Sequence, residues 1–498
     1  MKLHQVLWAA LPALTLGTTS CLSDSPFRPE RSALAVSEGW ANREEALLEL
    51  PEGGRFWLSF GDEELNQRIE RVLSANPDLD AAWRRLSQAD LAIAVARAGG
   101  RPEVNVEARA NRQRFVEGDG TAGGTSFGAR DQEFSQYRLT PTLNWELDLW
   151  GRIRAGVRAA EQDAAAARLD AESTALLLVA DTVESWISAR EQASILELLG
   201  EQIATSDAFT QLTEARFEQG QGSALDVLQS RGQAQGLRAD VPQFEGELSV
   251  FEHRLDILAG QAPGTTRLAS TPNLPEAPGL AESLPGPAHL LEHRPDVLAA
   301  WHRLLAADER IAVAVRDRLP ALRVSFTYTF LSSQVKELFD DQIANLVGTL
   351  TTPVTDGGRR RSEAERARAR TLEAWSQFRS TFLSALGEVE DALAREAAAA
   401  RRLTALEEQL DLADRRLEAA RLRYTQGLDD YLQVLTAIQN AQNLERVLLS
   451  QRAARLIQRV RVVRALGGSW TGELLEADPD APLDESTLSG TALEGSQA

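Results

Sequence analysis

The chain carries one long pattern twice, once in each half. Residues 77–86 (PDLDAAWRRL) return as 295–304 (PDVLAAWHRL), and residues 216–220 (RFEQG) return as 423–427 (RYTQG). Between these segments each half has a proline, an alternating stretch, a glycine–arginine pair and a long helical stretch. Self-similarity on this scale indicates a duplicated unit. We therefore expect two structural repeats, each ordered as helix, strand, strand, long helix and helix.

The strong negative charge excludes one large class of function. The 498 residues carry a formal net charge of −20. Nucleic acids are bound by clustered Lys and Arg, so a chain this acidic is not expected to bind them. The length suffices for several ordinary domains, but the repetition favours two halves of one body.

The first 20 residues have the composition of an export signal. They contain an apolar stretch at 6–17 that is too short to span a bilayer as a helix. Cys21 follows and is the only cysteine, so we expect cleavage before Cys21 and a covalent lipid, such as palmitate, on it. Thr18 departs from the usual Leu of lipoprotein signals, and Leu22 is not the Asp that retains lipoproteins in the inner membrane. Ordinary cleavage that leaves an inert cysteine is the alternative.

Four stretches show the period of two that is typical of β-strands. We predict strands at about 103–115 and 135–147 in the first half, and at about 321–331 and 342–354 in the second. Strands of about 10 residues can cross a bilayer at a tilt. Aromatic residues near the strand ends, such as Tyr137, suit a membrane interface. No later segment is apolar enough for a membrane-spanning helix, so the strands are the expected membrane segments.

The strands of one copy are too few for a barrel. Four strands cannot close one, and open edges in lipid would leave backbone groups unpaired. We therefore expect the barrel to be shared among copies of the chain. Two copies would supply eight strands and three would supply twelve; the strand count leaves both open.

Two very long helices are expected after the strand pairs. Residues 151–219 and 358–426 lack proline and are rich in Ala, Glu, Arg and Leu, which favour helices. At about 1.5 Å per residue each would reach roughly 100 Å. Breaks at 220–222 and 427–429 turn the chain back into shorter helices. The sequence thus predicts two long αα-hairpins.

These patterns divide the chain into six segments. They are a signal peptide (1–20), a lipid-anchored extended segment (21–60), a first repeat (61–260), a linker rich in Pro and Gly (261–287), a second repeat (288–468) and an acidic disordered tail (469–498).

The arrangement resembles the TolC family of bacterial outer-membrane efflux proteins, in particular its lipoprotein branch typified by OprM and NodT. The resemblance covers roughly residues 55–470. It depends on residues 145–152 (WELDLWGR), the related 356–359 (DGGR), residues 423–432 and the closing 465–470 (ALGGSW).

The resemblance implies a mostly α-helical homotrimer in the outer membrane of a Gram-negative bacterium. Its twelve-stranded β-barrel would be continued by a twelve-helix α-barrel in the periplasm. It also implies a periplasmic adaptor (membrane fusion) protein and an inner-membrane transporter as partners, often of the resistance–nodulation–division type. The expected function is a passive exit duct for small molecules such as drugs in a tripartite efflux system.

Candidate site residues lie at the ends of the two predicted hairpins. In the family these ends close the tunnel on the periplasmic side. Glycine permits sharp reversals and close approach of a partner's backbone, which makes Gly220 and Gly427 the predicted tip turns. The candidate aperture residues are Asp226, Asp429, Asp430, Tyr431, Leu432 and Gln433.

Several features of these ends favour a plainer interpretation. Threefold symmetry would turn each of the three aspartates into a ring of carboxylates that favours cations, but each can equally be a helix cap. This chain has Thr436 and Gln439 where relatives commonly carry an Asp and an Arg. Closure would then depend on hydrogen bonds, Leu432 or Tyr431 instead of ion pairs.

No motif predicts catalysis, and no cofactor is expected apart from the lipid on Cys21. Residues 289–293 (HLLEH) match the H-x-x-E-H zinc pattern, but Pro295 follows almost at once and the first half has no equivalent. We therefore predict neither a metal site nor an enzyme.

Other functions remain as alternatives. The same duct could serve a type I protein secretion system. A periplasmic coiled-coil adaptor without a pore would also have long helical hairpins, but not the two alternating strand pairs. A lipid-anchored hydrolase is disfavoured by the lack of a nucleophile–base arrangement.

Overall fold

The computed structural model describes most of the chain between Arg55 and Gly468. The described residues are 39–40, 55–117, 120–122, 125–127, 130–265, 267–268, 273–275 and 286–468. The predicted signal peptide, Cys21 and the acidic tail lie outside them, as do most of the extended N-terminal segment and part of the linker.

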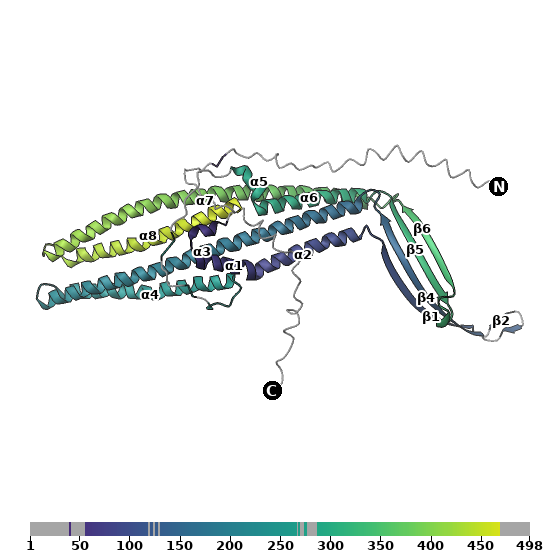
Figure 1. Ribbon diagram of the computed structural model, residues 1–498, viewed down its shortest axis with the longest axis horizontal. Helices are drawn as coiled ribbons and strands as arrows, with labels where there is room; N and C mark the ends of the chain where they lie inside the picture. Colours follow the sequence, from purple (N-terminus) through teal and green to yellow (C-terminus); the bar gives the residue numbers. More distant parts are fainter. Residues whose placement is uncertain are drawn as a thin grey trace, which may run out of the picture. The chain divides into compact units, whose positions relative to one another are not determined.

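Helices dominate the first half of the chain, which also supplies two long strands (Figure 1). A short η2 (Phe56–Phe60) and α1 (Glu63–Ala75) precede the repeated pattern. The following elements are α2 (Pro77–Ala98), β1 (Glu103–Glu117), β4 (Arg130–Leu147), α3 (Arg152–Glu218) and α4 (Ala224–Leu258), with a small hairpin of β2 (Gly120–Ala122) and β3 (Thr125–Phe127) between β1 and β4.

The long helices and strands of the second half follow in the same order, with η4 where the first half has the β2–β3 hairpin. Short η3 (Pro287–His289) and α5 (Leu290–His293) come first. They are followed by α6 (Pro295–Arg316), β5 (Ala321–Ser332), η4 (Val335–Glu337), β6 (Gln342–Thr351), α7 (Arg359–Thr425) and α8 (Tyr431–Leu466). Helices α3 and α7 each contain 67 residues. No helix among the described residues combines the length and the apolar character that crossing a membrane requires.

The corresponding helices α2 and α6 are stabilised at their N-termini by different interactions. The Asn76 side chain accepts hydrogen bonds from the backbone N–H groups of Asp78 and Leu79, and so caps α2. Arg294 precedes α6 and cannot cap in this way. Its buried guanidinium instead pairs with Asp296 and donates to the carbonyl of Ala465. Both starts share a proline at the first helical position and an Asp after it.

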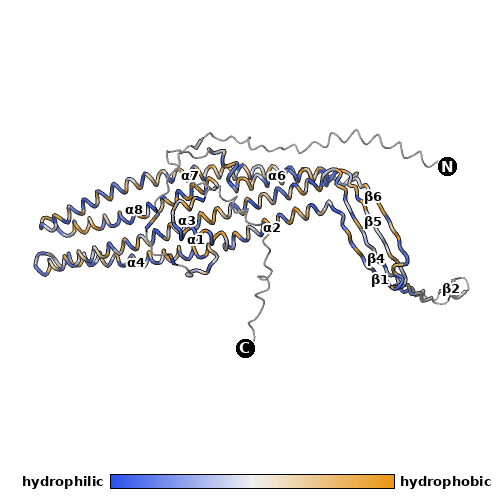
Figure 2. The backbone as a smooth tube through the Cα atoms, in the orientation of Figure 1, coloured by the Kyte–Doolittle hydropathy of each residue, from blue (hydrophilic) through white to orange (hydrophobic). Residues whose placement is uncertain are grey.

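The four long strands form one antiparallel sheet in the order β1-β4-β5-β6. The central pair joins the two halves of the chain, since β4 comes from the first and β5 from the second. The register places Val106 beside Pro141, Leu143 beside Phe326, and Phe326 beside Leu346. Polar and apolar residues follow one another along the same strands (Figure 2).

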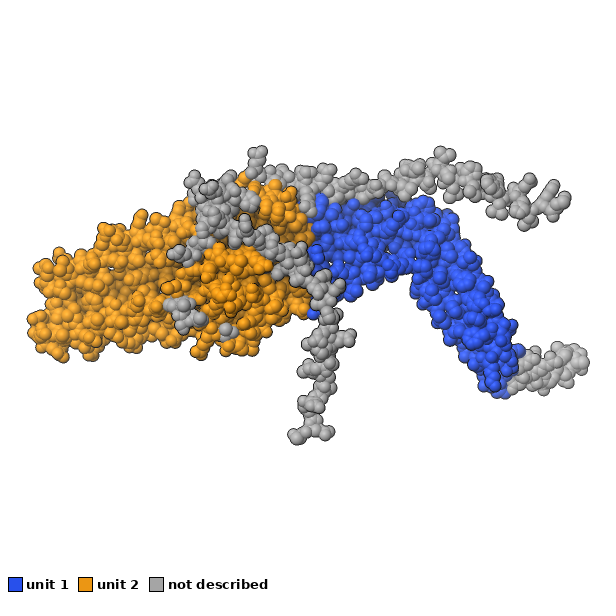
Figure 3. Space-filling view, viewed as in Figure 1, with its two compact units in different colours: residues 1–34, 84–168, 299–380 blue, residues 35–83, 169–298, 381–498 orange. Residues whose placement is uncertain are grey.

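The described chain divides into two compact units, and each takes segments from both halves (Figure 3). Unit 1 contains residues 84–168 and 299–380 and therefore the whole sheet. Unit 2 contains the described residues of 35–83, 169–298 and 381–498. The predicted division at a linker follows the sequence, whereas these units follow spatial proximity.

Unit 2 has a well-packed apolar core. Trp186, Leu199 and Phe382 are fully buried, and the ring of Phe60 meets Trp186 edge-on at 6.3 Å between centroids. The guanidinium of Arg190 lies 5.2 Å from the Trp186 ring. Packing of this kind buries the apolar stripe of an amphipathic helix against its neighbours.

Candidate functional site

One face of the four-stranded sheet is apolar from edge to edge. Successive side chains on a strand point to opposite faces, and paired residues share a face, so the register defines this apolar sheet face. Its members are Val104, Val106, Ala108, Ala110, Tyr137, Leu139, Pro141, Leu143, Trp145, Leu147, Leu322, Val324, Phe326, Tyr328, Phe330, Ala344, Leu346, Gly348 and Leu350. The opposite face carries mainly Asn, Thr, Ser, Arg and Glu, although Phe134 of β4, Leu331 of β5, and Ile343 and Val347 of β6 also lie there.

No described part of the protein covers the apolar sheet face. None of the four strands has a buried residue wherever its side chains are described. Leu346 is 73% exposed and Val104 is 63% exposed. A contiguous apolar surface of this kind marks a site of contact with another molecule or a membrane.

The two outer strands leave open edges. Within the described chain β1 pairs only with β4, and β6 only with β5. An open edge presents unpaired backbone N–H and C=O groups, and it is a template for pairing with another chain. The sheet can therefore be extended at both sides.

The two hairpin ends have the same backbone turn. Gly220 and Gly427 have φ of 72° and 73°, the left-handed region that favours glycine. In each turn the glycine N–H bonds three residues back, to Phe217 or Tyr424, and the next N–H bonds five residues back, to Arg216 or Arg423. This double closure satisfies the last carbonyls of α3 and α7.

The return helices start differently at the two ends. The Ser223 hydroxyl accepts from the Asp226 N–H, and the Asp226 carboxylate accepts from the Ser223 N–H, which makes a capping box for α4. Asp430 holds the equivalent position before α8, but its side chain makes no capping bond. Arg423 instead donates two hydrogen bonds to Asp429, at 2.5 and 2.9 Å.

An aromatic cluster fills the end of the α7/α8 hairpin. The rings of Tyr424 and Tyr431 are buried, with centroids 5.7 Å apart. Val434, Leu435 and Ile438 complete the buried cluster. Burial raises the pKa of both phenols, so they stay neutral at physiological pH.

Arg216 ties the α3/α4 hairpin to the α7/α8 hairpin. Its guanidinium lies over the Tyr424 ring at 4.4 Å from the centroid, and Nη1 donates to the Tyr424 carbonyl at 3.1 Å. A cation over an aromatic face is worth about 0.5–2 kcal/mol. Arg421 of α7 lies in turn 4.9 Å from the Phe209 ring of α3, so two reciprocal cation–aromatic contacts join the hairpins near their turns.

Glutamine side chains continue this connection along the helices. Gln439 of α8 donates to Gln233 of α4, which donates to Gln442 of α8. Gln202 of α3 donates to the Gln442 carbonyl and to Glu445. Apolar packing joins the hairpins here as well, since Leu449 of α8 packs against the cluster of Ile195, Leu199 and Leu237 from α3 and α4.

Comparison with known proteins assigns the chain to a family. The model of the outer membrane efflux protein family matches residues 68–261 and 286–468. The chain belongs to the outer membrane efflux protein family.

Relatives of known function agree over nearly the whole length. The chain is 29% identical to the outer membrane protein OprJ of Pseudomonas aeruginosa, covering 93% of this chain and 95% of OprJ. It is 28% identical to the toluene efflux pump outer membrane protein TtgF of Pseudomonas putida, covering 92% of this chain and 96% of TtgF. The structure of the outer-membrane channel OprN matches with a TM-score of 0.79 and 25% identity, covering 91% of this chain and 100% of OprN. This protein is an efflux channel of the outer membrane.

The predicted aperture residues of this efflux protein lie in the two hairpin ends, but some of their side chains are exposed and others are buried. Leu432, Gln433 and Asp430 are exposed. Tyr431, expected among the aperture residues, is 2% exposed and packs against Tyr424. Its side chain therefore supports the hairpin end from inside and does not line a surface.

The aspartates also differ from one another. Asp226 is engaged as a helix cap, which is the plainer of its two predicted roles. Asp429 is held by Arg423, and hydrogen bonds from that guanidinium lower the pKa of its carboxyl. Asp430 alone of the three has no hydrogen bond to its carboxylate from a described residue.

Two functional candidates of the efflux protein are missing from the predicted set, namely Arg216 and Tyr424. Their signal is the repeated Arg-aromatic pair, Arg216-Phe217 and Arg423-Tyr424. The recurrence marks both pairs as candidates, but the pairing of Arg216 with Tyr424 becomes visible only when the two hairpins are placed together.

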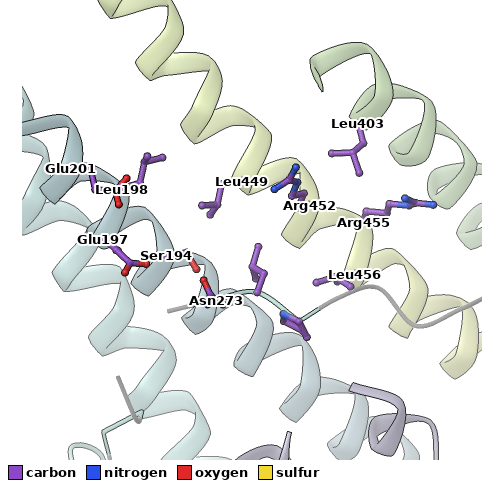
Figure 4. A pocket seen from close by; sticks show the side chains of 12 residues that line it. Ser194, Glu197, Leu198, Glu201, Asn273, Leu403, Leu449, Arg452, Arg455 and Leu456 are labelled. Atoms are coloured by element: carbon purple, nitrogen blue, oxygen red, sulfur yellow. The ribbon is translucent and has the colours of Figure 1, made fainter. Parts of the chain in front are cut away.

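Unit 2 also has a partly open pocket of about 600 Å³ between α3, α7, α8 and the linker segment 273–275. Glu197 and Glu201 of α3 lie on one side, and Arg452 and Arg455 of α8 lie on the other (Figure 4). The arginines pair with Glu407 and Glu396.

The discounted zinc pattern takes a form that does not suit a metal. The rings of His289 and His293 stack in parallel with centroids 3.8 Å apart. A metal ion lies near the plane of each imidazole that binds it, and one ion cannot do so for two stacked rings. The described residues contain no group of three or more potential metal ligands.

Proposed function

We propose that three copies of this chain form a passive exit duct across the outer membrane. The observation that carries this proposal is the apolar sheet face, which no described part of the protein covers. Four strands from each copy would pair through the open edges of β1 and β6 into a closed barrel of twelve. Lipid would then contact the apolar face, and water would contact the polar one. Three copies are preferred to two because of the family resemblance.

The long helices would prolong the duct into the periplasm. A helix of 67 residues has a length of roughly 100 Å at about 1.5 Å per residue. Four helices from each copy, α3, α4, α7 and α8, would give an α-barrel of twelve. No step in this transport requires covalent chemistry, so the duct is proposed to act without catalysis.

The hairpin ends would form the closed periplasmic aperture. Opening would move the α7/α8 hairpin away from α3/α4, which requires breaking the Arg216–Tyr424 contact and the glutamine hydrogen bonds. Asp430 and Leu432, which are exposed, are the side chains best placed to face the opening or a partner. Gly220 and Gly427 are proposed as the tip turns that a partner approaches.

The proposed partners are a periplasmic adaptor and an inner-membrane transporter of the resistance–nodulation–division type. Relatives such as TtgF are named as outer membrane proteins of efflux pumps, which supports a place in such an assembly. Lipidation of Cys21 after removal of residues 1–20 is proposed as an additional anchor.

One experiment tests the duct directly. The native protein is extracted in detergent, its mass is measured, and its conductance is recorded in a planar bilayer. We expect a trimer that opens discrete water-filled channels. A water-soluble monomer without conductance would contradict the duct and favour the pore-less adaptor.

A further inference from the structure

The four connections between strands and helices in unit 1 lie in one continuous row. Trp145 Nε1, at the end of β4, donates to the carbonyl of Gly100 between α2 and β1, at 2.9 Å. Trp150 Nε1, between β4 and α3, donates to the carbonyl of Pro320 between α6 and β5, at 2.7 Å. Arg360, at the start of α7, donates to Asp317 at 2.9 Å. Each connection is thus hydrogen-bonded to the next, and we call residues 99–102, 146–154, 316–321 and 352–361 the junction belt.

The junction belt is basic although the chain is strongly acidic. It holds eight arginines, namely Arg101, Arg152, Arg154, Arg316, Arg318, Arg359, Arg360 and Arg361, and four carboxylates, namely Glu146, Asp148, Asp317 and Asp356. The whole chain has a net charge of −20. A local excess of positive charge in such a chain is not a consequence of composition.

The carboxylates of the belt are already engaged. Glu146 pairs with Arg152, Asp148 pairs with Arg154, and Asp317 and Asp356 both pair with Arg360. Arg316 donates to the Gly151 carbonyl.

Four exposed arginines remain: Arg101, Arg318, Arg359 and Arg361. None of them has a hydrogen-bonded carboxylate partner in the described part of the chain. The charge of Arg359 acts on Asp356, but the Asp356 carboxylate is already paired with Arg360. They come from three different connections, so their charges are spread along the row.

Interfacial side chains accompany these arginines. Trp145 and Trp150 are both exposed, and each donates its indole N–H to a backbone carbonyl of the belt. Leu149 and Val354 are exposed beside them, and Val354 has 90% of its surface exposed. The apolar sheet face adjoins the belt at Val104, Leu322 and Leu350, and Leu147 belongs to both. Indoles and arginines at the border of an apolar band are typical of the level of lipid headgroups.

We propose that the junction belt binds the phosphate groups of anionic phospholipids. The planar guanidinium group donates paired hydrogen bonds to phosphate oxygens. Basic residues next to a membrane-embedded segment attract anionic headgroups, and their effects add along the surface. Four unpaired arginines along one row fit several headgroups side by side. This inference rests on the proposed function, which brings the sheet into the membrane.

The test measures lipid retention by the full-length protein in a neutral detergent. Phosphatidylglycerol or phosphatidylcholine is added, and bound lipid is counted by native mass spectrometry. We expect the wild type to retain phosphatidylglycerol in preference to phosphatidylcholine. The variant R101Q/R318Q/R359Q/R361Q should weaken phosphatidylglycerol retention by about tenfold or more and leave phosphatidylcholine retention unchanged.

A matched variant controls for the loss of four positive charges. R366Q/R370Q/R395Q/R415Q removes four exposed arginines of α7 that lie outside the belt. It should retain phosphatidylglycerol as the wild type does. Equal weakening in both variants, or no lipid preference in the wild type, would overturn the proposal.

Two further readouts separate the possible causes. Inorganic phosphate at millimolar concentration should not displace the lipid; displacement would indicate a site for free phosphate and would also overturn the proposal. Conductance is recorded in a neutral bilayer for the wild type. Channels without lipid preference would refute the belt alone, whereas the absence of channels would refute the duct on which it rests.

Discussion

The sheet of unit 1 and the core helices of unit 2 differ in how far they expose the same kind of apolar side chain. Phe382 of α7 in unit 2 is 1% exposed, whereas Phe326 of β5 in unit 1 is 39% exposed. In unit 2 the helices enclose a core in which Trp186, Leu199 and Phe382 are buried, although α4 and α7 also keep exposed leucines. The apolar sheet face has no such neighbour among the described residues.

The difference shows which surroundings each region needs in order to bury its apolar side chains. Burying apolar surface contributes roughly 25 cal/mol per Å², and unit 2 obtains this within one chain. The sheet can obtain it only from an external apolar medium. A bilayer supplies that medium, provided that all backbone groups are paired, which a closed barrel achieves. The account therefore makes different predictions for equivalent substitutions in the two regions.

The largest effect is expected for a charge placed on the apolar sheet face. Phe326→Arg puts a guanidinium near the middle of β5, where a lipid-facing Arg costs about 2–4 kcal/mol in each copy. We expect little assembled protein in outer-membrane fractions. Thr327→Arg, its neighbour on the polar face, should assemble normally. Equal loss in the two variants would mean that the faces are not distinguished by lipid.

Removal of a phenyl ring sharpens the comparison between the two regions. Phe382→Ala should lower the free energy of unfolding by about 3–5 kcal/mol, because it empties a packed core. Phe326→Ala should cost far less when unfolding is measured in detergent, since its ring has no protein core to leave. Denaturant titration followed by circular dichroism measures both. Similar losses would place Phe326 in a protein core and contradict the account.

A smaller effect is expected at the contact between the hairpins of unit 2. Arg216→Gln removes the cation–aromatic contact with Tyr424, which is worth about 0.5–2 kcal/mol. Hydrogen exchange in residues 423–435 should become faster, and channels should open more often. Arg231→Gln is the control, because Arg231 pairs with Glu214 inside the α3/α4 hairpin. A control variant that exchanges as fast as Arg216→Gln would show that the contact does not hold the hairpins together.

The smallest effect is a pH dependence at the second hairpin end. Arg423 lowers the pKa of Asp429, so the pair stabilises the turn above the usual aspartate pKa of about 3.9. That stability is lost as the pH falls through the lowered value. Hydrogen exchange of residues 426–430, corrected for its intrinsic pH dependence, should therefore accelerate on acidification.

Two variants isolate the contribution of this carboxylate. Asp429→Asn should exchange faster at neutral pH and lose the acid transition. Asp411→Asn, on the exposed surface of α7, should behave as the wild type does. An acid transition that survives in Asp429→Asn would assign it to another group.

Local sequence predicts which helices and strands form, whereas the residues at which the strands begin and end depend on how the strands pair. Alternation alone reveals β5, and the absence of proline reveals α3 and α7. The structure ends β6 at Thr351, short of the predicted 354, because Pro353 has no N–H for a ladder. It begins β4 at Arg130, ahead of the predicted 135, because pairing with β1 continues to Glu117.

At the hairpin ends, too, some features follow from local sequence and others depend on contacts between helices. The glycine turns and the Ser223–Asp226 capping box are local, and sequence spacing is enough to find them. Burial of Tyr431 depends on Tyr424 and on residues of other helices, which no local pattern encodes. The Arg216–Tyr424 contact joins residues 208 positions apart, so it becomes visible only when both hairpins are folded.

The most direct test of the central claim asks what touches the apolar sheet face. Single cysteines at Phe326 and Thr327, in a Cys21→Ser background, are labelled with a fluorophore, and the protein is reconstituted in bilayers. We predict that brominated lipid quenches the label at 326 strongly and that aqueous iodide quenches the label at 327. A label at 326 that is shielded from lipid, or that iodide reaches as readily as it reaches 327, would contradict the claim.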